Sequence, residues 1–161
     1  MIKKEFPFSI EIYSSILELS SLDSILLEHA RAITKSAYAP YSKFNVGAAA
    51  QLVDGNIVTG TNQENASYPI GICAERVLLS AVSSQFVNAG IVTMAISYDN
   101  TNGESKRPIS PCGMCRQSLV EYEERTKQDI RIILSGMEGE VFIIEKAHYL
   151  LPLSFMSGDL K

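Results

Sequence analysis

Hydrophobic positions along the chain follow two periods, about 3.6 residues in some segments and about two in others. The first helical segment begins at Ser20, which together with Asp23 resembles a capping box, and it cannot continue through Pro40. Its apolar stripe repeats at helical spacing and comprises Leu22, Ile25, Leu26, His29, Ala30 and Ile33. We therefore expect a helix that packs this stripe against the core, with His29 packed or partly buried rather than bound to a metal.

Strand-like patterns follow this helix. Small and branched side chains alternate over residues 45–53, and Asp54-Gly55 supplies the turn of a hairpin into residues 56–60. Short apolar runs predict three more strands, at residues 91–98, 130–134 and 141–144.

The N-terminal residues show a weaker strand pattern. Apolar side chains alternate there, at Phe6, Phe8, Ile10 and Ile12. Residues 1–13 are therefore either a short strand, placed at a sheet edge by Pro7, or a loosely docked arm.

Two further helices are predicted between the strands. Residues 73–86 have apolar side chains at helical spacing, which places Cys73 near the first turn. After a polar loop at residues 99–107, Cys112 opens a third helix with Cys115, Leu119 and Tyr122 on one face. Strands interleaved with helices in this way predict an α/β sandwich built on a mixed sheet.

Composition and charge narrow the class of protein. A chain of 161 residues that is 46% hydrophobic fits one domain, residues 1–161, with residues 1–13 as an N-terminal extension. A net charge of -4 without clustered lysines and arginines disfavours nucleic acid as a partner. Pro7 and Glu11 interrupt the segment after Lys3 and Lys4, so we expect no signal peptide, and no apolar run is long enough to span a membrane.

All three cysteines lie in two short motifs, Cys73-Ala74-Glu75 and Pro111-Cys112-Gly113-Met114-Cys115. Either motif alone is weak evidence, since redox proteins share Cys-x-x-Cys, but together they account for every thiol in the chain. Three protein ligands leave the fourth position of zinc to water, which is typical of catalytic sites. We expect one zinc ion per chain, bound by Cys73, Cys112 and Cys115. The odd cysteine count argues against a disulfide framework and favours a reducing compartment, the cytoplasm.

The placement of the cysteines at two helix N-termini would help them to ionise. Unpaired backbone N–H groups and the helix dipole both lower thiol pKa values there. Three thiolates around a dication leave one net negative charge, which Arg76 and Arg116 are placed to offset. The alternative interpretation is that both arginines are ordinary solvated residues.

The spacing of the two motifs resembles the signature of zinc deaminases, in which a ligand, one residue and a glutamate precede Pro-Cys-x-x-Cys. Zinc lowers the pKa of a bound water to about 7. In such a site Glu75 would take a proton from the water and deliver it to a ring nitrogen. A carboxylate that works in both directions benefits from a raised pKa in a dry pocket.

Beyond these motifs the chain resembles the small zinc-dependent cytidine deaminases of the three-cysteine type. The matching blocks are residues 37–44, residues 46–49, residues 62–76 except positions 63 and 70, residues 111–117, and Leu150-Leu151-Pro152 with Phe155. The resemblance implies a three-layer α/β/α sandwich with a mixed five-stranded sheet. It also implies deamination of cytidine and deoxycytidine to uridine and deoxyuridine plus ammonia, in pyrimidine salvage.

The resemblance assigns further roles to individual residues. It implies that Asn62 and Glu64 bind the ribose hydroxyls, that Phe44 packs against the pyrimidine, and that the Ala74 backbone reads the ring edge together with Glu75. It implies a homotetramer, in which Tyr68 helps to build a shared site and Phe155 closes the site of a neighbouring subunit. Gln117 belongs to the second ligand block and would support it. The alternative for Phe44 and Phe155 is that they are plain core aromatics.

Three other functions remain open from sequence. The same chemistry could act on another amino-heterocycle, such as a blasticidin-type antibiotic, although Asn62 and Glu64 favour cytidine. A nucleic-acid editing deaminase is disfavoured by the acidic composition. A non-catalytic, zinc-stabilised binding module would leave Glu75 without a purpose.

Overall fold

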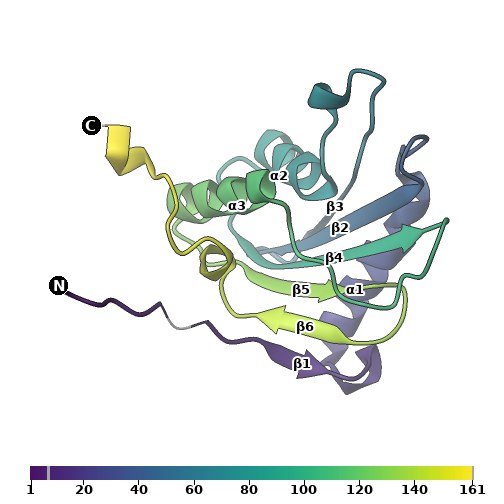
Figure 1. Ribbon diagram of the computed structural model, residues 1–161, viewed down its shortest axis with the longest axis horizontal. Coiled ribbons are helices and arrows are strands. Elements are labelled where there is room, and N and C mark those ends of the chain that lie inside the picture. Colours follow the sequence, from purple (N-terminus) through teal and green to yellow (C-terminus); the bar gives the residue numbers. More distant parts are fainter. Residues whose placement is uncertain (7, 161) are drawn as a thin grey trace.

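The computed structural model describes residues 1–6 and 8–160, and it contains one mixed sheet in the order β1-β6-β5-β4-β2-β3 (Figure 1). Only β4 and β5 run parallel; the other neighbours are antiparallel. The strands are β1 (Glu11–Tyr13), β2 (Phe44–Leu52), β3 (Ile57–Thr61), β4 (Ile91–Asn100), β5 (Arg131–Ser135) and β6 (Val141–Ile144). The helices are α1 (Ser21–Ile33), α2 (Ala74–Gln85) and α3 (Gly113–Thr126).

The described residues form six strands rather than the expected five. The additional strand is β1, where Ile12 faces Phe142 of β6 across an antiparallel edge. The alternating pattern at the N-terminus therefore yields a strand only over its last three residues, while residues 1–6 extend away from the sheet (Figure 1). Pro7, on which the edge-strand prediction rested, lies outside the described residues.

The sheet separates two apolar layers, which confirms the three-layer arrangement. On one face, α2 and α3 pack over alternate residues of the central strands, such as Ala48, Ala50, Met94 and Ile96. On the other face, α1 packs over the intervening residues, such as Ala49 and Ala95. This alternation follows from the two-residue period of a strand whose two faces are both covered.

Two glycines let helices approach the sheet closely from opposite sides. A Cβ atom at Gly47 would lie 2.1 Å from the carbonyl oxygen of Ala30 in α1. A Cβ atom at Gly60 would lie 2.6 Å from the backbone nitrogen of Leu78 and 2.7 Å from the carbonyl oxygen of Ala74 in α2. Gly60 therefore sets how near the first turns of α2 lie to β3.

The predicted stripe of α1 is partly wrong. Ser20 caps the helix as expected, since its Oγ accepts a hydrogen bond from the backbone N–H of Asp23. The helix buries Leu26, Leu27 and Ala30, however, while Leu22, Ile25 and His29 are exposed. Apolar residues lie on two overlapping faces of this helix, and the close approach at Gly47 selects the face that contains Ala30.

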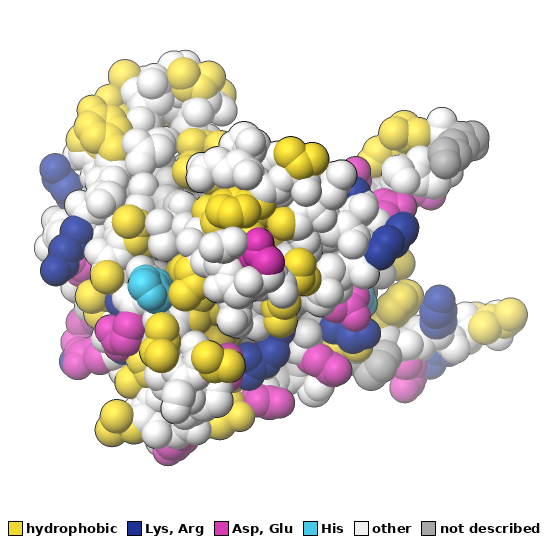
Figure 2. All heavy atoms as spheres, turned by 180° about the vertical axis from the view of Figure 1, so that it is seen from behind, with side chains coloured by type: hydrophobic (Ala, Val, Ile, Leu, Met, Phe, Trp, Pro, Cys, Tyr) yellow, Lys and Arg dark blue, Asp and Glu magenta, His cyan; other side chains and the backbone are white. Residues whose placement is uncertain are grey.

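Exposed hydrophobic side chains gather on the face that lies behind the sheet in Figure 1, as Figure 2 shows. Leu22 and Ile25 are 68% and 52% exposed, although the spacing alone predicts that they are buried. Within the described part of the chain, no helix combines the length and the apolar character needed to cross a membrane.

Candidate active site

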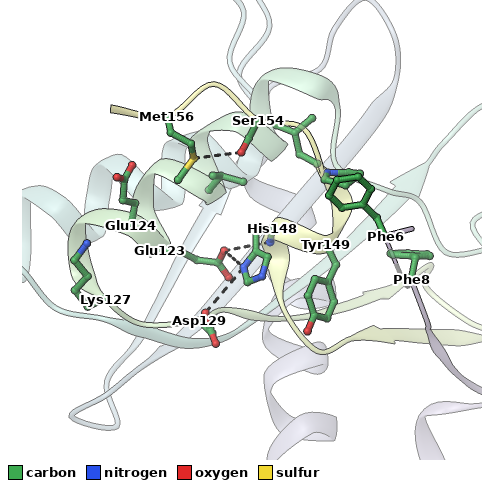
Figure 3. A pocket seen from close by; sticks show the side chains of 13 residues that line it. Phe6, Phe8, Glu123, Glu124, Lys127, Asp129, His148, Tyr149, Ser154 and Met156 are labelled. Atoms are coloured by element: carbon green, nitrogen blue, oxygen red, sulfur yellow. Dashed lines mark hydrogen bonds and ion pairs between the residues drawn. The ribbon is translucent and has the colours of Figure 1, made fainter. Parts of the chain in front are cut away.

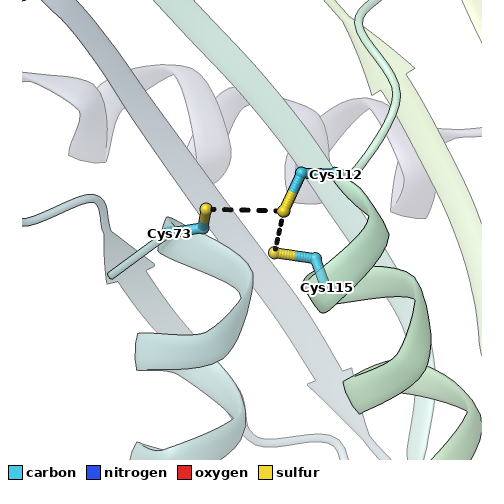
Figure 4. Close-up of side chains that lie close together, drawn as sticks. All are labelled: Cys73, Cys112 and Cys115. Carbon is cyan, nitrogen blue, oxygen red and sulfur yellow. Dashed lines mark hydrogen bonds between the residues drawn. The ribbon is translucent and has the colours of Figure 1, made fainter. Parts of the chain in front are cut away.

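The three cysteines converge from the starts of two helices. Cys73 is the N-cap residue of α2 and Cys112 that of α3, and Cys115 lies in the first turn of α3 (Figure 4). The Cys73 and Cys112 sulfurs are 3.8 Å apart, and those of Cys112 and Cys115 are 3.5 Å apart. Two sulfurs at about 2.3 Å from a tetrahedral zinc ion lie about 3.8 Å apart. The sulfur spacing therefore fits a zinc ion bound by all three.

Neither N-cap cysteine caps its helix. The side chains of Cys73 and Cys112 make no capping hydrogen bond, although both residues have the extended backbone of an N-cap. Ser, Thr, Asp or Asn at such a position would contribute about 0.5–2 kcal/mol. Both helices thus forgo a stabilising cap, which is typical of residues retained for a site rather than for the fold.

The thiol groups of Cys73 and Cys115 differ in the direction of their pKa shifts. A hydrogen bond from Cys115 lowers the pKa of the Cys73 thiol to about 6, and Cys112 and the positive charge of Arg76 act in the same direction. The contact with Cys73, together with burial, raises the pKa of the Cys115 thiol. A divalent cation would stabilise all three as thiolates.

Glu75 lies beside the cysteines in the first turn of α2 and is only 5% exposed. Burial raises the pKa of its carboxyl group, and hydrogen bonding, including from Cys115, and the charge of Arg76 partly offset that rise. A raised pKa makes this carboxyl group a better proton acceptor, which suits a group that both takes and returns a proton.

A cavity of about 470 Å³ opens over this cluster. Its wall includes Glu75, Cys73 and Cys112 together with the aromatic ring of Phe44 and the polar side chains of Asn62 and Glu64. One cavity therefore combines potential metal ligands, a buried carboxyl group, an aromatic surface and polar groups suited to hydroxyls.

Comparison with known proteins agrees with this geometry. The family model described as the cytidine and deoxycytidylate deaminase zinc-binding region matches residues 20–128. The chain belongs to this family. A curated cytidine deaminase from Halalkalibacterium halodurans is 36% identical over 136 residues, which cover 84% of this chain and 96% of that relative.

Solved structures of deaminases support the same assignment. The cytidine deaminase of Burkholderia pseudomallei superposes with a TM-score of 0.72 at 36% identity, covering 85% of this chain and all of that one. The cytidine deaminase of Mycobacterium tuberculosis superposes with a TM-score of 0.63 at 30% identity, covering 84% of this chain and 98% of that one.

Two of the residues predicted to bind substrate already make hydrogen bonds to the backbone in this deaminase fold. The side-chain oxygen of Asn62 accepts from the N–H of Val46 at 2.8 Å, and its nitrogen donates to the carbonyl of Phe44 at 2.9 Å. Each polar atom of Asn62 retains one further donor or acceptor position for a ligand. Asn62 can therefore shape the start of β2 and still contact a hydroxyl.

Glu64 is held in a similar way. Its carboxylate accepts hydrogen bonds from the backbone N–H groups of Tyr41 at 2.9 Å and Ser42 at 3.3 Å. A hydrogen bond with the Ser42 side chain, followed by these backbone bonds, keeps the pKa of Glu64 below its usual value. Glu64 is therefore an ionised acceptor with lone pairs left for a diol.

The remaining predicted residues occupy different places. Tyr68 lines the cavity and is 73% exposed, and Ala74 is fully buried at the start of α2. Phe155 is not among the residues that line this cavity; it is 59% exposed in the C-terminal segment, where its carbonyl accepts a hydrogen bond from Gln117 at 2.7 Å.

The two arginines near the ligands differ in their contacts. Arg76 is placed so that its charge lowers the pKa values of both Cys73 and Glu75. Arg116 donates instead to the carbonyl oxygens of Pro111 at 2.9 Å and Leu150 at 3.0 Å. Arg116 thus ties the second ligand motif to the C-terminal region, and its effect on the charge of a metal site stays a prediction.

Sequence reasoning missed several residues of the cavity wall. Besides the residues already named, the wall is lined by Ser42, Val46, Ile96, Ile109 and Ser110, among others. Val46 and Ile96 read as ordinary strand positions, since only the pairing of β2 with β4 brings them to the mouth of the site. Ser110 adjoins the second ligand motif, and that proximity was the only available signal.

A second group of potential metal ligands lies elsewhere. Glu123, Asp129 and His148 have donor atoms within 4.8 Å of one another, and they line a larger cavity of about 710 Å³ (Figure 3). Both oxygens of Glu123 are already used, however. They accept from the backbone N–H groups of Ile130 at 2.7 Å, Ala147 at 3.1 Å and His148 at 3.1 Å, and one contacts the ring nitrogen of His148 at 2.9 Å.

Proposed function

We propose that this protein catalyses the hydrolytic deamination of cytidine and deoxycytidine to uridine and deoxyuridine, releasing ammonia, as a step of pyrimidine salvage. The observation that carries the proposal is the single cavity that a buried Glu75, beside three converging cysteines, lines together with Phe44, Asn62 and Glu64. The names of the relatives and of the solved structures point to the same reaction.

Cys73, Cys112 and Cys115 would hold the zinc ion, which when bound supplies a Lewis acid that activates water. Glu75 accepts a proton from the water as the water oxygen adds to the amine-bearing ring carbon. Glu75 delivers that proton to the adjacent ring nitrogen. It then carries the proton of the added hydroxyl group to the amine, so that the bond between the ring carbon and the amine breaks, ammonia leaves and the hydroxyl oxygen becomes the carbonyl oxygen of the product. The raised pKa of Glu75 suits both directions of transfer.

Other residues of the cavity wall would bind the nucleoside. Phe44 offers an aromatic surface to the pyrimidine, and Asn62 and Glu64 together donate to and accept from the ribose hydroxyls. The backbone of Ala74, beside Glu75, would read the ring edge. This division predicts that the enzyme prefers a nucleoside to the free base cytosine.

The test is the ultraviolet absorbance change of cytidine on addition of metal-quantified protein, with ammonia measured in parallel. Conversion with about one zinc ion per chain supports the proposal. Absence of turnover by zinc-loaded protein contradicts it. The same assay with a blasticidin-type nucleoside and with a cytosine-containing oligonucleotide at physiological salt tests the two rival substrates.

Assembly as a homotetramer is a further part of the proposal. Phe155 does not line the cavity of its own chain, and Tyr68 lines it while remaining largely exposed, so both are available to a neighbouring subunit. We place the enzyme in the cytoplasm, because three unpaired thiols persist in a reducing compartment.

Mixed assemblies test whether sites are shared. Phe155→Ala and Glu75→Gln chains, each weakly active alone, should regain activity when they are unfolded together and refolded as hybrids, since one intact site can then draw Glu75 and Phe155 from different chains. Hybrids no more active than the two parents would contradict sharing, and light scattering of each sample reports the oligomeric state.

A further inference from the structure

The ring of Phe44, which lines the candidate site, is backed by a second aromatic ring. Tyr98 of β4 stacks on Phe44 with ring centroids 4.7 Å apart and an angle of 16° between the planes. In the antiparallel pairing of β2 with β4, Val46 faces Tyr98 and Phe44 faces Asn100. Phe44 and Tyr98 are thus diagonal neighbours on one face of the sheet, a spacing that aromatic side chains can bridge.

The two rings differ in what they reach. Tyr98 is only 3% exposed and is not among the residues that line the cavity, whereas Phe44 is partly exposed and does line it. Since Tyr98 covers one face of the Phe44 ring, the surface that Phe44 presents to a ligand depends on the plane that Tyr98 imposes.

The backbone around Phe44 is fixed independently of Tyr98. The N–H of Phe44 donates to the Ser42 hydroxyl oxygen at 3.1 Å, and its carbonyl accepts from Asn62 at 2.9 Å. The preceding residue, Lys43, adopts a left-handed φ of 59°, and its carbonyl accepts from the N–H of Thr101 at 3.1 Å. With the main chain held on both sides, the main freedom left to Phe44 is rotation of its ring.

We infer that Tyr98 is a positioning residue for substrate binding: it holds Phe44 in the plane that packs against the flat heterocycle of the nucleoside. The inference rests on the proposed function. It extends the site to Tyr98, which does not line the cavity. The buried ring of Tyr98 would fix the orientation of the partly exposed ring of Phe44.

The expected effect falls on KM rather than on kcat. Packing against the ring stabilises bound substrate and transition state about equally, and loss of such uniform binding raises KM with kcat unchanged. The geometric preference of one aromatic contact corresponds to roughly two- to tenfold in affinity. Glu75 and the cysteines keep their positions, because neither Phe44 nor Tyr98 belongs to α2 or α3.

The experiment compares wild type, Tyr98→Phe, Tyr98→Leu and a matched core variant, Leu52→Ala, each with its zinc content measured. Leu52 is 1% exposed on β2, on the same face of the sheet but at the far end of the strand from Phe44. The measurements are kcat and KM for cytidine and the inhibition constant of uridine, which reports binding without chemistry.

We expect Tyr98→Leu to raise KM and the uridine inhibition constant together by about two- to tenfold, with kcat changed by less than about twofold. Tyr98→Phe keeps the stacked ring and should match wild type, and Leu52→Ala should lose stability but keep its KM. If Tyr98→Leu does not accumulate, Tyr98→Met takes its place, because its unbranched side chain adapts better to the space left by the ring.

Two results would overturn the inference: a wild-type KM in the Tyr98→Leu variant, or an equal rise of KM in Leu52→Ala, which would indicate general loosening of the core. Failure of the wild-type protein to convert cytidine is a separate outcome. It would remove the proposed function, whereas the variant comparison decides the role of Tyr98 only in an enzyme that turns over.

Discussion

The cysteine cluster and the Glu123 cluster both bring three potential metal ligands together, but they differ in how their donor atoms are used. The sulfurs of Cys73 and Cys112 make no capping hydrogen bond, although each residue occupies the N-cap position of a helix. The carboxylate of Glu123 is saturated by three backbone N–H groups and the ring of His148. Proximity of ligand atoms is therefore not enough to indicate a metal site, because the lone pairs must also be free.

The contrast also assigns the two clusters to different tasks. Glu123 of α3 joins the start of β5 to the 3₁₀ helix η4 (Ala147–Leu150), since it receives the N–H groups of Ile130, Ala147 and His148. That is a structural junction. The cysteines join the starts of α2 and α3 only through their sulfurs, which suits a metal that binds after folding or during it.

The largest expected effect is loss of the metal from a cysteine variant. Cys112→Ala removes one of three ligands, so zinc content measured by atomic absorption should fall from about one per chain to near zero, with loss of turnover and of thermal stability. His148→Ala is the matched control at the other cluster and should keep its zinc. A full metal complement in Cys112→Ala would show that the ligand assignment is wrong.

The next effect separates chemistry from metal binding within the cysteine site. Glu75→Gln keeps the size of the side chain and removes the proton acceptor, so kcat for cytidine should fall by about 10²- to 10⁴-fold while zinc content stays the same. Glu121→Gln on the exposed side of α3 is the charge-matched control. Turnover at the wild-type rate in Glu75→Gln would rule out the proposed proton transfer.

The third prediction concerns the Glu123 cluster. Glu123→Gln replaces one acceptor oxygen by an NH₂ group and leaves the buried N–H of His148 or its neighbours without a partner, which should cost about 1–3 kcal/mol in the free energy of unfolding. The exposed variant Glu121→Gln, on the same helix, should change that free energy by less than about 0.5 kcal/mol.

Both variants should keep their zinc and their KM for cytidine. Urea denaturation with the metal content fixed is the appropriate measurement. Loss of zinc from Glu123→Gln would break the comparison, because it would give the second cluster a part in metal binding.

The convergence of the three cysteines was predictable from the sequence because its evidence is local. Each ligand motif falls within a few residues at a helix start, and helix periodicity around residues 73–86 and after Cys112 agrees with α2 and α3. The strands were also predictable, from alternation in the hairpin and from short apolar runs in the later strands. The order of the sheet and the pairing of β1 with β6 were not, because they depend on contacts between distant segments.

Features that depend on which of two similar faces is buried were not predictable in the same way. The predicted α1 stripe has the right period, but its members Ile25 and His29 are exposed whereas Leu26 and Ala30 are buried. The saturation of Glu123 and the stacking of Tyr98 on Phe44 need three-dimensional pairing, since the partners are up to 54 residues apart. Local patterns thus predict the candidate ligands, whereas the residues that support the site follow only from the assembled sheet.

The smallest effect tests whether the Glu123 region serves stability alone. Lys127 ends α3 with a left-handed φ of 55°, and this turn leads the chain toward Ile130, whose N–H reaches Glu123. A residue with a Cβ atom destabilises the folded protein by about 1–2 kcal/mol in that conformation relative to glycine. The greater conformational freedom of glycine in the unfolded chain partly offsets this difference. Lys127→Gly should therefore stabilise the protein by about 0.5 kcal/mol, measured by urea denaturation. Lys127→Ala removes the same charge but keeps the Cβ atom, so it should not stabilise the protein.

Neither variant should alter KM or zinc content if the junction is purely structural. A kinetic change in Lys127→Gly alone would show that the backbone between α3 and β5 is coupled to the cysteine site.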